Sequence, residues 1–340
     1  MAAFFVLFEN DRALRRERVF RDRIDPLDKF TDYELIARYR FPRRTVLELT
    51  DLIRNAVQHP TSRSCAIPAH TQAFTTLRFL AKGEYLSEVA DIHRISISSA
   101  SRIITNVTSA LCQLLDNVKF PTTNADLAKV KDEFYQLANF PNVIGAIDGT
   151  LIPIQGMTGD EEPNFICRKG FPAINVQGVV DANLRFSNIV VRWPGATHDS
   201  FVLGNSLLPN IMGLVNGWLL GDSGYPLKKW LLTPFLDPRT PQEQRYNSAH
   251  CTTRNTVERA FGVLKSRFRC IHKTGGSLQF APEKCIKIIE CCLRLHNKAI
   301  DARIPMNAGN GPMQLYQNNI VYQGVDNDGI AVRQRVVQRF

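Results

Sequence analysis

Three carboxylates stand in sequence settings where an acidic side chain is unfavourable to bury. Asp148 interrupts the apolar run NVIGAIDGTLIPI, Asp222 follows the apolar segment GWLLG, and Glu258 lies in the basic segment RNTVERAFGVLKSRFR. Carboxylates held close together in a low-dielectric setting repel one another unless a positive charge lies between them. A divalent cation supplies that charge, so the three residues are candidate metal ligands.

The chemistry that such a site performs is phosphodiester chemistry. Mg²⁺ prefers oxygen ligands and keeps several waters, so a few carboxylates hold it and leave positions for a substrate phosphate. Two such ions about 4 Å apart activate an attacking oxygen on one side and stabilise the leaving oxygen on the other. We predict that Asp148, Asp222 and Glu258 are catalytic and hold Mg²⁺ or Mn²⁺, with two ions expected.

The segment around Glu258 predicts a helix with a basic face and a buried face. Arg254, Glu258 and Lys265 recur on one face at helical spacing, while the opposite stripe is apolar. Residues 254–273 contain six basic residues and one acid. We predict that Arg254 and Lys265, together with Arg168 and Lys169 in the segment RKGF, contact a phosphate backbone.

Each acid also has an ordinary structural explanation. Asp148 could be a turn residue before Gly149, and Glu258 could form a surface ion pair with Arg254. Taken singly, these explanations are favoured, but together with the order of strands described below the metal site is favoured. A glycoside hydrolase also uses paired acids, yet it has no need of a basic helix. No G-x-S-x-G segment supports a nucleophilic serine.

The elements that position the acids are those of a mixed sheet. Residues 173–181 and 184–193 flank a turn and predict a hairpin, with Asp148 in the strand before it. Further elements expected in order are a helix over 197–212, a short buried strand ending at Asp222, a long helix from about 252 to 268 and a helix over 282–298. This order predicts an α/β fold over residues 121–304, in which helices flank a mixed sheet.

Residues 1–120 predict an all-helical N-terminal domain. Near 85–110, two helical segments are joined by a tight turn at 94–96, which is the layout of a helix-turn-helix. The second helix would direct Ser98 and Arg102 toward a DNA groove. The competing interpretation is a helical bundle that only packs on the next domain, because any two helices joined by a short turn look alike.

Composition restricts the partners. A net charge of +10 and a pI near 9.3 indicate a polyanionic partner, either nucleic acid or an acidic membrane surface. No segment reaches the roughly 18 apolar residues of a membrane span, so we expect a soluble intracellular protein with no membrane partner. Residues 305–340 are rich in Asn, Gln and Gly and predict a flexible tail, whose last residues, VRQRVVQRF, could dock as a short helix.

These motifs occur together in one known family. The chain resembles the PIF/Harbinger DDE transposases in IDGT at Asp148, and in four further segments: RKGF at 168–171, WPGATHDS at 193–200, LLGDSGYPL at 219–227 and RNTVERAFGVLKSRFR at 254–269. The resemblance runs from about residue 33 to the last helix of the predicted core.

The resemblance implies a ribonuclease-H-like catalytic fold that cleaves and transfers DNA strands with two metal ions. The family's acids match Asp148, Asp222 and Glu258, with 35 residues between the last two. Asp199, in the segment HDS, matches a fourth family acid and is expected at the metal site. The resemblance also implies a separate Myb/SANT-like DNA-binding partner protein and a location in the nucleus, with the cytoplasm as a second location.

We therefore interpret the chain as a metal-dependent nuclease or transposase that acts on double-stranded DNA. The alternative is a domesticated DNA- or protein-binding module that keeps the fold and cleaves nothing. An active transposase and a host-retained nuclease, as a single chain or as a homo-oligomer, both fit the sequence.

Overall fold

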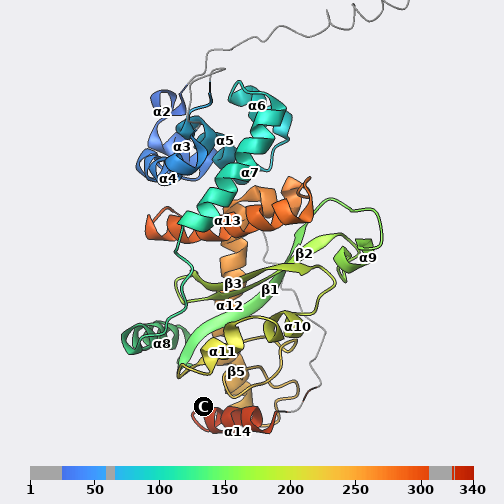
Figure 1. Ribbon diagram of the computed structural model, residues 1–340. Coiled ribbons are helices and arrows are strands. Elements are labelled where there is room, and N and C mark those ends of the chain that lie inside the picture. The colour runs from blue at the N-terminus through green and yellow to red at the C-terminus, as the bar shows by residue number, and fades with distance from the viewer. Residues whose placement is uncertain (1–24, 59–65, 306–323, 325) are drawn as a thin grey trace, which may run out of the picture.

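The computed structural model describes residues 25–58, 66–305, 324 and 326–340 (Figure 1). Its N-terminal region is helical, as predicted. The helices of this region are α2 (Pro26–Lys29), α3 (Asp32–Tyr39), α4 (Arg43–Val57), α5 (Ala69–Lys82), α6 (Leu86–Ile92) and α7 (Ile97–Leu114).

Local signals explain where these helices begin. Thr31 opens α3 with a capping box, and the Ser96 side chain accepts a hydrogen bond from Ser99 N at the start of α7. Arg94 has a φ of 52°, which reverses the chain between α6 and α7. Two helices joined by a tight turn are therefore present where the sequence predicted them, and their use in DNA binding stays a prediction.

Within the described residues, a five-stranded mixed sheet has the order β3-β2-β1-β4-β5. The strands are β1 (Val143–Pro153), β2 (Ala173–Val180), β3 (Phe186–Pro194), β4 (Trp218–Leu220) and β5 (Leu231–Leu232). β1 pairs with β2 in antiparallel orientation and with β4 in parallel orientation. The predicted α/β class is confirmed, and β1 is the central strand.

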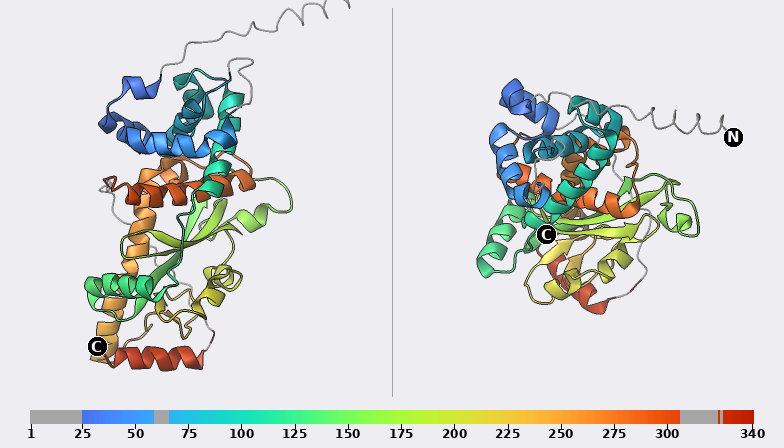
Figure 2. Two further views of the ribbon diagram at one scale, coloured as in Figure 1. Left: turned by 60° about the vertical axis from the view of Figure 1, so that its left-hand side comes forward. Right: turned by 45° about the horizontal axis from the view of Figure 1, so that its top comes forward.

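Helices cover both faces of this sheet (Figure 2). On one face, the Phe261 ring of α12 (Pro241–Arg267) lies 5.3 Å from the Phe186 ring of β3. On the other face, α10 (Asp199–Gly204) and α11 (Leu208–Met212) share an apolar cluster with Ile147 of β1. The remaining elements are α8 (Asn124–Ala138), α9 (Glu162–Phe165), η1 (Arg269–Ile271), η2 (Lys273–Gly275), α13 (Pro282–Asp301) and α14 (Asn327–Val337).

The helical region and the sheet are packed together rather than joined by a free linker. α13 lies between them and contacts α7 on one side and β3 on the other (Figure 1). A single apolar cluster includes buried residues of α4, α5, α7, α12, α13 and the sheet. The two regions are therefore successive in sequence but share one core.

The helix that carries Glu258 is longer than the sequence prediction. It was expected from about residue 252, but α12 begins at Pro241. Thr240 caps it and Glu243 completes a capping box, while proline suits a first turn because that turn needs no N–H donor. The prolines before residue 241 suggested a loop, and the capping signal among them was missed.

Two other elements differ from expectation. The single helix predicted over 197–212 is divided into α10 and α11, and Pro209 lies in the first turn of α11. Within the segment predicted as a flexible tail, the described residues form α14, which Asp326 caps. Val336 and Val337 are buried against the Tyr246 side of α12. The final helix therefore docks, as the sequence suggested for its last residues.

The described cysteines form no disulfide among themselves, and Cys65 lies outside the described residues. None of the helices in the described part of the chain is long and apolar enough to span a membrane.

Two buried histidines should make the fold sensitive to acid. His250 Nε2 lies 3.0 Å from Leu232 O, and His296 Nε2 lies 2.9 Å from Leu184 O. Burial lowers the pKa of each to about 3. In the unfolded chain each histidine binds a proton near pH 6.5. The contribution of each neutral histidine to the free energy of unfolding is therefore complete above that pH and is lost as the pH falls toward 3.

We expect each histidine to lower the free energy of unfolding by about 2 kcal/mol between pH 7 and pH 5. Urea unfolding of the wild type and of His296→Asn at both pH values measures this effect. In His296→Asn, the loss of unfolding free energy from pH 7 to pH 5 should be about half of the loss that the two histidines together cause in the wild type. An unchanged difference between the two pH values would contradict the prediction.

Candidate metal centre and active site

Asp148 lies within β1 on the face that α12 covers. It is in register with Gly178 of β2. A Cβ on Gly178 would lie 2.9 Å from the Phe186 ring and 3.1 Å from the Phe261 ring of α12. Directly paired residues of antiparallel strands project to the same side of a sheet. The Asp148 side chain therefore projects toward α12.

Asp222 lies just beyond β4, the parallel neighbour of β1. Leu220 of β4 pairs with Ala146, so continuation of the strand brings Asp222 level with Asp148. Gly224 N donates to Asp222 Oδ1 at 3.0 Å, and Gly149 N donates to Asp148 Oδ1 at 2.8 Å. The first two predicted acids are therefore level with each other, Asp148 on β1 and Asp222 just beyond the neighbouring β4.

Arg254 connects the third acid to the first. Its guanidinium donates from Nη1 to Asp148 Oδ2 at 3.3 Å and from Nη2 to Glu258 Oε1. The side chains of Arg254, Asp148 and Glu258 are 16%, 16% and 17% exposed, so the cluster is recessed but reachable from solvent. The Arg254–Glu258 ion pair considered from the sequence exists, but it includes Asp148 and does not lie on the open surface.

The carboxylates of this cluster repel one another, and a positive charge among them lowers that repulsion. Burial raises the pKa of Asp148 to about 8; Arg254 opposes the shift, whereas Asp222 and Asp199 add to it. Burial alone would lower the pKa of Arg254, but the surrounding carboxylates, Asp148 first, raise it. Arg254 is thus the positive charge that the fold itself supplies to the acids.

Asp199 approaches the site from the other face of β1. A Cβ on Gly149 would overlap the Asp199 carboxylate where it now lies, so glycine at this position lets Asp199 pack directly against β1. Because side chains alternate along a strand, Gly149 faces away from α12. Asn175 Nδ2 donates to Asp199 Oδ1 at 3.1 Å. The structure therefore places the fourth predicted acid beside the cluster but across the strand from Asp148.

A buried polar layer on that second face was not predicted. The Tyr225 hydroxyl donates to Gln177 Oε1 at 3.3 Å. Burial raises the pKa of Tyr225 well above its usual value, and the nearby carboxylates add to the shift, so its hydroxyl stays protonated. Asn175 and Gln177 are two residues apart on β2, so both side chains project to this face, and the strand is buried throughout. Their polarity in the segment AINVQGVV was the sequence signal for this layer.

The predicted phosphate-binding residues fall into two groups. Arg168 and Lys169 are exposed on the turn that precedes β2. Lys265 instead lies on α12 and donates to Thr150 Oγ1 at 2.6 Å. Thr150 follows Asp148 on β1. Burial lowers the pKa of Lys265 to about 8, and Lys169 acts in the same direction.

Ser98 and Arg102 lie in the first turns of α7, in the helical region rather than among the carboxylates. Both residues are exposed. Arg102 Nε donates to Ser98 O at 3.3 Å, and the Ser98 hydroxyl lies 3.0 Å from that of Ser96. They are accessible to a partner at the start of the helix.

The donor atoms suit a hard divalent cation, because every predicted ligand is a carboxylate. The buried negative charge around Arg254 is also what a metal ion would neutralise. In the described part of the chain, however, no three acidic, histidine or cysteine side chains converge tightly enough to form a ready metal cluster. Arg254 contacts only Oδ2 of Asp148 and Oε1 of Glu258, so a metal ion on these acids would lie beside the guanidinium.

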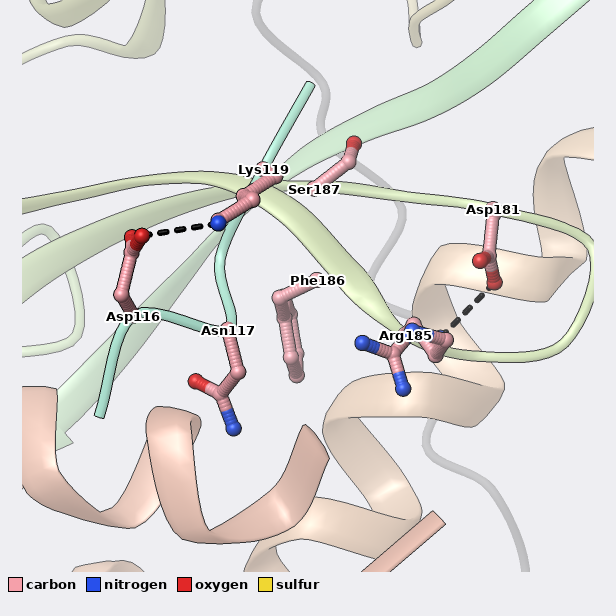
Figure 3. Close-up of a pocket in the computed structure, with 7 residues that line it drawn as sticks. All are labelled: Asp116, Asn117, Lys119, Asp181, Arg185, Phe186 and Ser187. Atoms are coloured by element: carbon pink, nitrogen blue, oxygen red, sulfur yellow. Dashed lines mark hydrogen bonds and ion pairs between the residues drawn. The ribbon is translucent and has the colours of Figure 1, made fainter. Parts of the chain in front are cut away.

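A separate cavity of about 250 Å³ lies where the chain leaves α7 (Figure 3). Its lining residues are Asp116, Asn117, Lys119, Asp181, Arg185, Phe186 and Ser187. Asp116 and Lys119 form an ion pair at 2.8 Å, and Asp181 accepts a hydrogen bond from Arg185 N at 2.9 Å. None of the predicted catalytic acids lines this cavity, so it is not part of the carboxylate site.

Part of the chain matches a known protein family. Residues 147–297 match the family described as DDE superfamily endonuclease. This span contains all four predicted acids.

Individual relatives extend the similarity over most of the chain. HARBI1 of Homo sapiens, a protein named as a nuclease, is 37% identical over 294 residues, which are 85% of this chain and 84% of the relative. HARBI1 of Xenopus laevis is 32% identical over 317 residues, 92% and 91% of the two chains. An ALP1-like protein of Arabidopsis thaliana is 26% identical over 306 residues, 84% and 73% of the two chains. No solved structure matches the chain.

Replacing Arg254 should expose its role as a counterion. Arg254→Met leaves Asp148 and Glu258 without their cation, and we expect the free energy of unfolding to fall by about 3 kcal/mol. Urea unfolding measures the loss. Added Mn²⁺ should stabilise the variant more than the wild type, because no guanidinium competes for the acids.

Arg239→Met is the matched control, because Arg239 is 83% exposed and pairs with Asp237 on the surface. Its unfolding free energy should change by less than about 1 kcal/mol. If Arg254→Met were as stable as the wild type, the counterion role would be wrong.

Proposed function

We propose that this chain, which belongs to the family of Harbinger-derived DDE endonucleases, cleaves and transfers DNA phosphodiester bonds in a metal-dependent reaction. One observation carries the proposal: Asp148 and Glu258 converge on one recessed cation, with Asp222 on the adjacent strand. Acids on two neighbouring strands and on a helix across them are what a ribonuclease-H-like catalytic fold requires, and we include that fold in the proposal.

Asp148, Asp222 and Glu258 would hold Mg²⁺ or Mn²⁺, two ions in this proposal, with Asp199 as a fourth acid. When bound, the ions would supply activation of the attacking oxygen and stabilisation of the leaving oxygen. The protein's own contribution is to hold the acids at fixed positions on β1, just beyond β4 and on α12. Gly149 allows Asp199 to pack against β1, and Asn175 orients that carboxylate.

The cations of the site would orient the DNA backbone. The Arg254 guanidinium holds the acids together in the metal-free protein, and its two-pronged geometry also suits a phosphate. Lys265 lies against Thr150 on the α12 face of β1. Arg168 and Lys169, exposed before β2, would contact phosphates farther along the same strand of DNA.

The pair α6 and α7 is proposed as a helix-turn-helix that binds double-stranded DNA. The exposed position of Ser98 and Arg102 at the start of α7 supports this role, because recognition helices contact bases with their N-terminal residues. A separate Myb/SANT-like partner protein, a main location in the nucleus with the cytoplasm second, and assembly as a homo-oligomer are further parts of the proposal. The net charge of +10 supports the DNA partner, and the other parts rest on the family resemblance.

Loss of a catalytic carboxylate should abolish cleavage. We expect Asp148→Asn and Glu258→Gln each to lower the rate of cutting of a labelled duplex by about a thousandfold, equal to roughly 4 kcal/mol of activation free energy. Gel analysis of purified protein with Mg²⁺ or Mn²⁺ measures the rate. Asp51→Asn, which changes a carboxylate that is 66% exposed on α4, should cut at the wild-type rate.

Equal activity in the wild type and in both site variants would identify a contaminating nuclease and defeat the enzyme proposal. Retention of DNA without cutting, under any metal or partner, would favour the second candidate, a domesticated binding module. One observation favours that candidate: Arg254 already occupies the space between two of the acids, and the described residues form no ready metal cluster.

The proposed helix-turn-helix is tested by a binding measurement. Ser98→Ala/Arg102→Gln, made in an Asp148→Asn chain that cannot cut, should bind duplex DNA about tenfold more weakly, since a contact of this kind contributes about 1 to 3 kcal/mol. Fluorescence anisotropy measures the affinity. Arg44→Gln is the control, because Arg44 is 90% exposed on α4. Equal affinities would mean that α6 and α7 serve only in packing.

A further inference from the structure

The segment between α12 and α13 is fixed to both parts of the molecule. On the side of the helical region, a Cβ on Gly83, at the end of α5, would lie 3.0 Å from Cys270 Cα. On the side of the sheet, Leu278 N donates to Pro153 O at 3.1 Å, and Gln155 N donates to Leu278 O at 2.9 Å. The segment therefore runs from the end of α5 to the end of β1.

Basic side chains lie along this segment. Arg269 and Lys273 are exposed on the segment, and Lys82 is half-buried at the end of α5. The chain carries no acidic residue between Glu258 and Glu283. The acid that follows Lys82, Glu84, forms its ion pair with Arg78. Acidic side chains therefore offset little of this positive charge.

The charges along the segment also repel one another. Burial and then neighbouring cations, Arg269 among them, lower the pKa of Lys82 and that of His272. Burial, and then cations that include Lys273, lower the pKa of Lys169. The positive field thus continues from α5 to Lys169, which in turn acts on Lys265 near Asp148. A polyanion laid along the segment would relieve this repulsion.

We infer that Lys82, Arg269 and Lys273, here called the basic ridge, bind the phosphate backbone of the double-stranded DNA that enters the carboxylate site. The inference rests on the proposed function and extends the DNA contact onto the junction between the helical region and the sheet. A duplex fits better than an acidic peptide because its phosphates form a long, regular row of charge that can reach all three cations. Backbone contacts carry no base information, so the ridge positions the DNA and does not select its sequence.

The salt dependence of binding tests the ridge. The triple variant Lys82→Gln/Arg269→Gln/Lys273→Gln is made in the full-length Asp148→Asn chain, and its affinity for a fluorescent duplex is measured by anisotropy over a KCl series. Each lost phosphate contact removes about 0.9 from the slope of log K against log salt, so the slope should become shallower by about 2 to 3. The loss should be the same for duplexes of unrelated sequence.

The matched control removes the same charge elsewhere. Lys119, Lys129 and Arg239 are 67%, 75% and 83% exposed and lie outside the ridge, so Lys119→Gln/Lys129→Gln/Arg239→Gln should leave the slope within about 1 of its parent. Thermal melting checks that each variant is folded. If the triple ridge variant does not fold, Lys273→Gln alone should still reduce the slope by about 1.

The outcomes separate this inference from the proposed function. Equal slopes in the ridge variant and the control would overturn the ridge while leaving the nuclease proposal intact. Tighter binding of a single-stranded probe than of the duplex would overturn the assignment of the ridge to double-stranded DNA. If the Asp148→Asn parent bound no nucleic acid at all, the proposed function would fail with the ridge.

Discussion

The contact of Arg254 with Asp148 and Glu258 joins the long helix to the central strand. Buried carboxylates are unfavourable without a partner, and this guanidinium lies between two of them in a recess that is largely closed to solvent. The apolar residues Val257, Ala260 and Phe261 of α12 are buried and fix the rotation of the helix. The apolar stripe and the ion pairs therefore specify the same orientation of α12 on the sheet.

The same contact opposes the proposed chemistry. Arg254 bonds Oδ2 of Asp148 and Oε1 of Glu258, so a metal ion that used those two oxygens would compete with the guanidinium. Exchange of the guanidinium for a metal ion would remove this conflict, because the negative charge would stay neutralised. Arg254 would then be close to the acids with its donors available, where a substrate phosphate must lie.

The sequence predicted those features that depend on local pattern. The apolar run that Asp148 interrupts and the run that Asp222 follows predicted the strands β1 and β4, and the hairpin of β2 and β3 follows from its turn. Arg254 was assigned to phosphate binding, whereas in the structure it bonds Asp148, 106 residues away in the chain. Such a partner is fixed only by tertiary packing. The position of Asp199 across the strand likewise depends on side-chain alternation at Gly149 and on the path of α10, which no local signal specifies.

The shared core determines how a long substrate could lie on the molecule. α13 packs against both α7 and β3, and the segment after α12 is bonded to the end of β1 and pressed against the end of α5. The start of α7 and the carboxylates consequently keep a fixed relation, without a free linker between them. A stiff duplex that touches both must follow one path over the surface, and its backbone needs cations wherever that path crosses the junction. Exposed Arg269 and Lys273 occur on the segment that forms that junction.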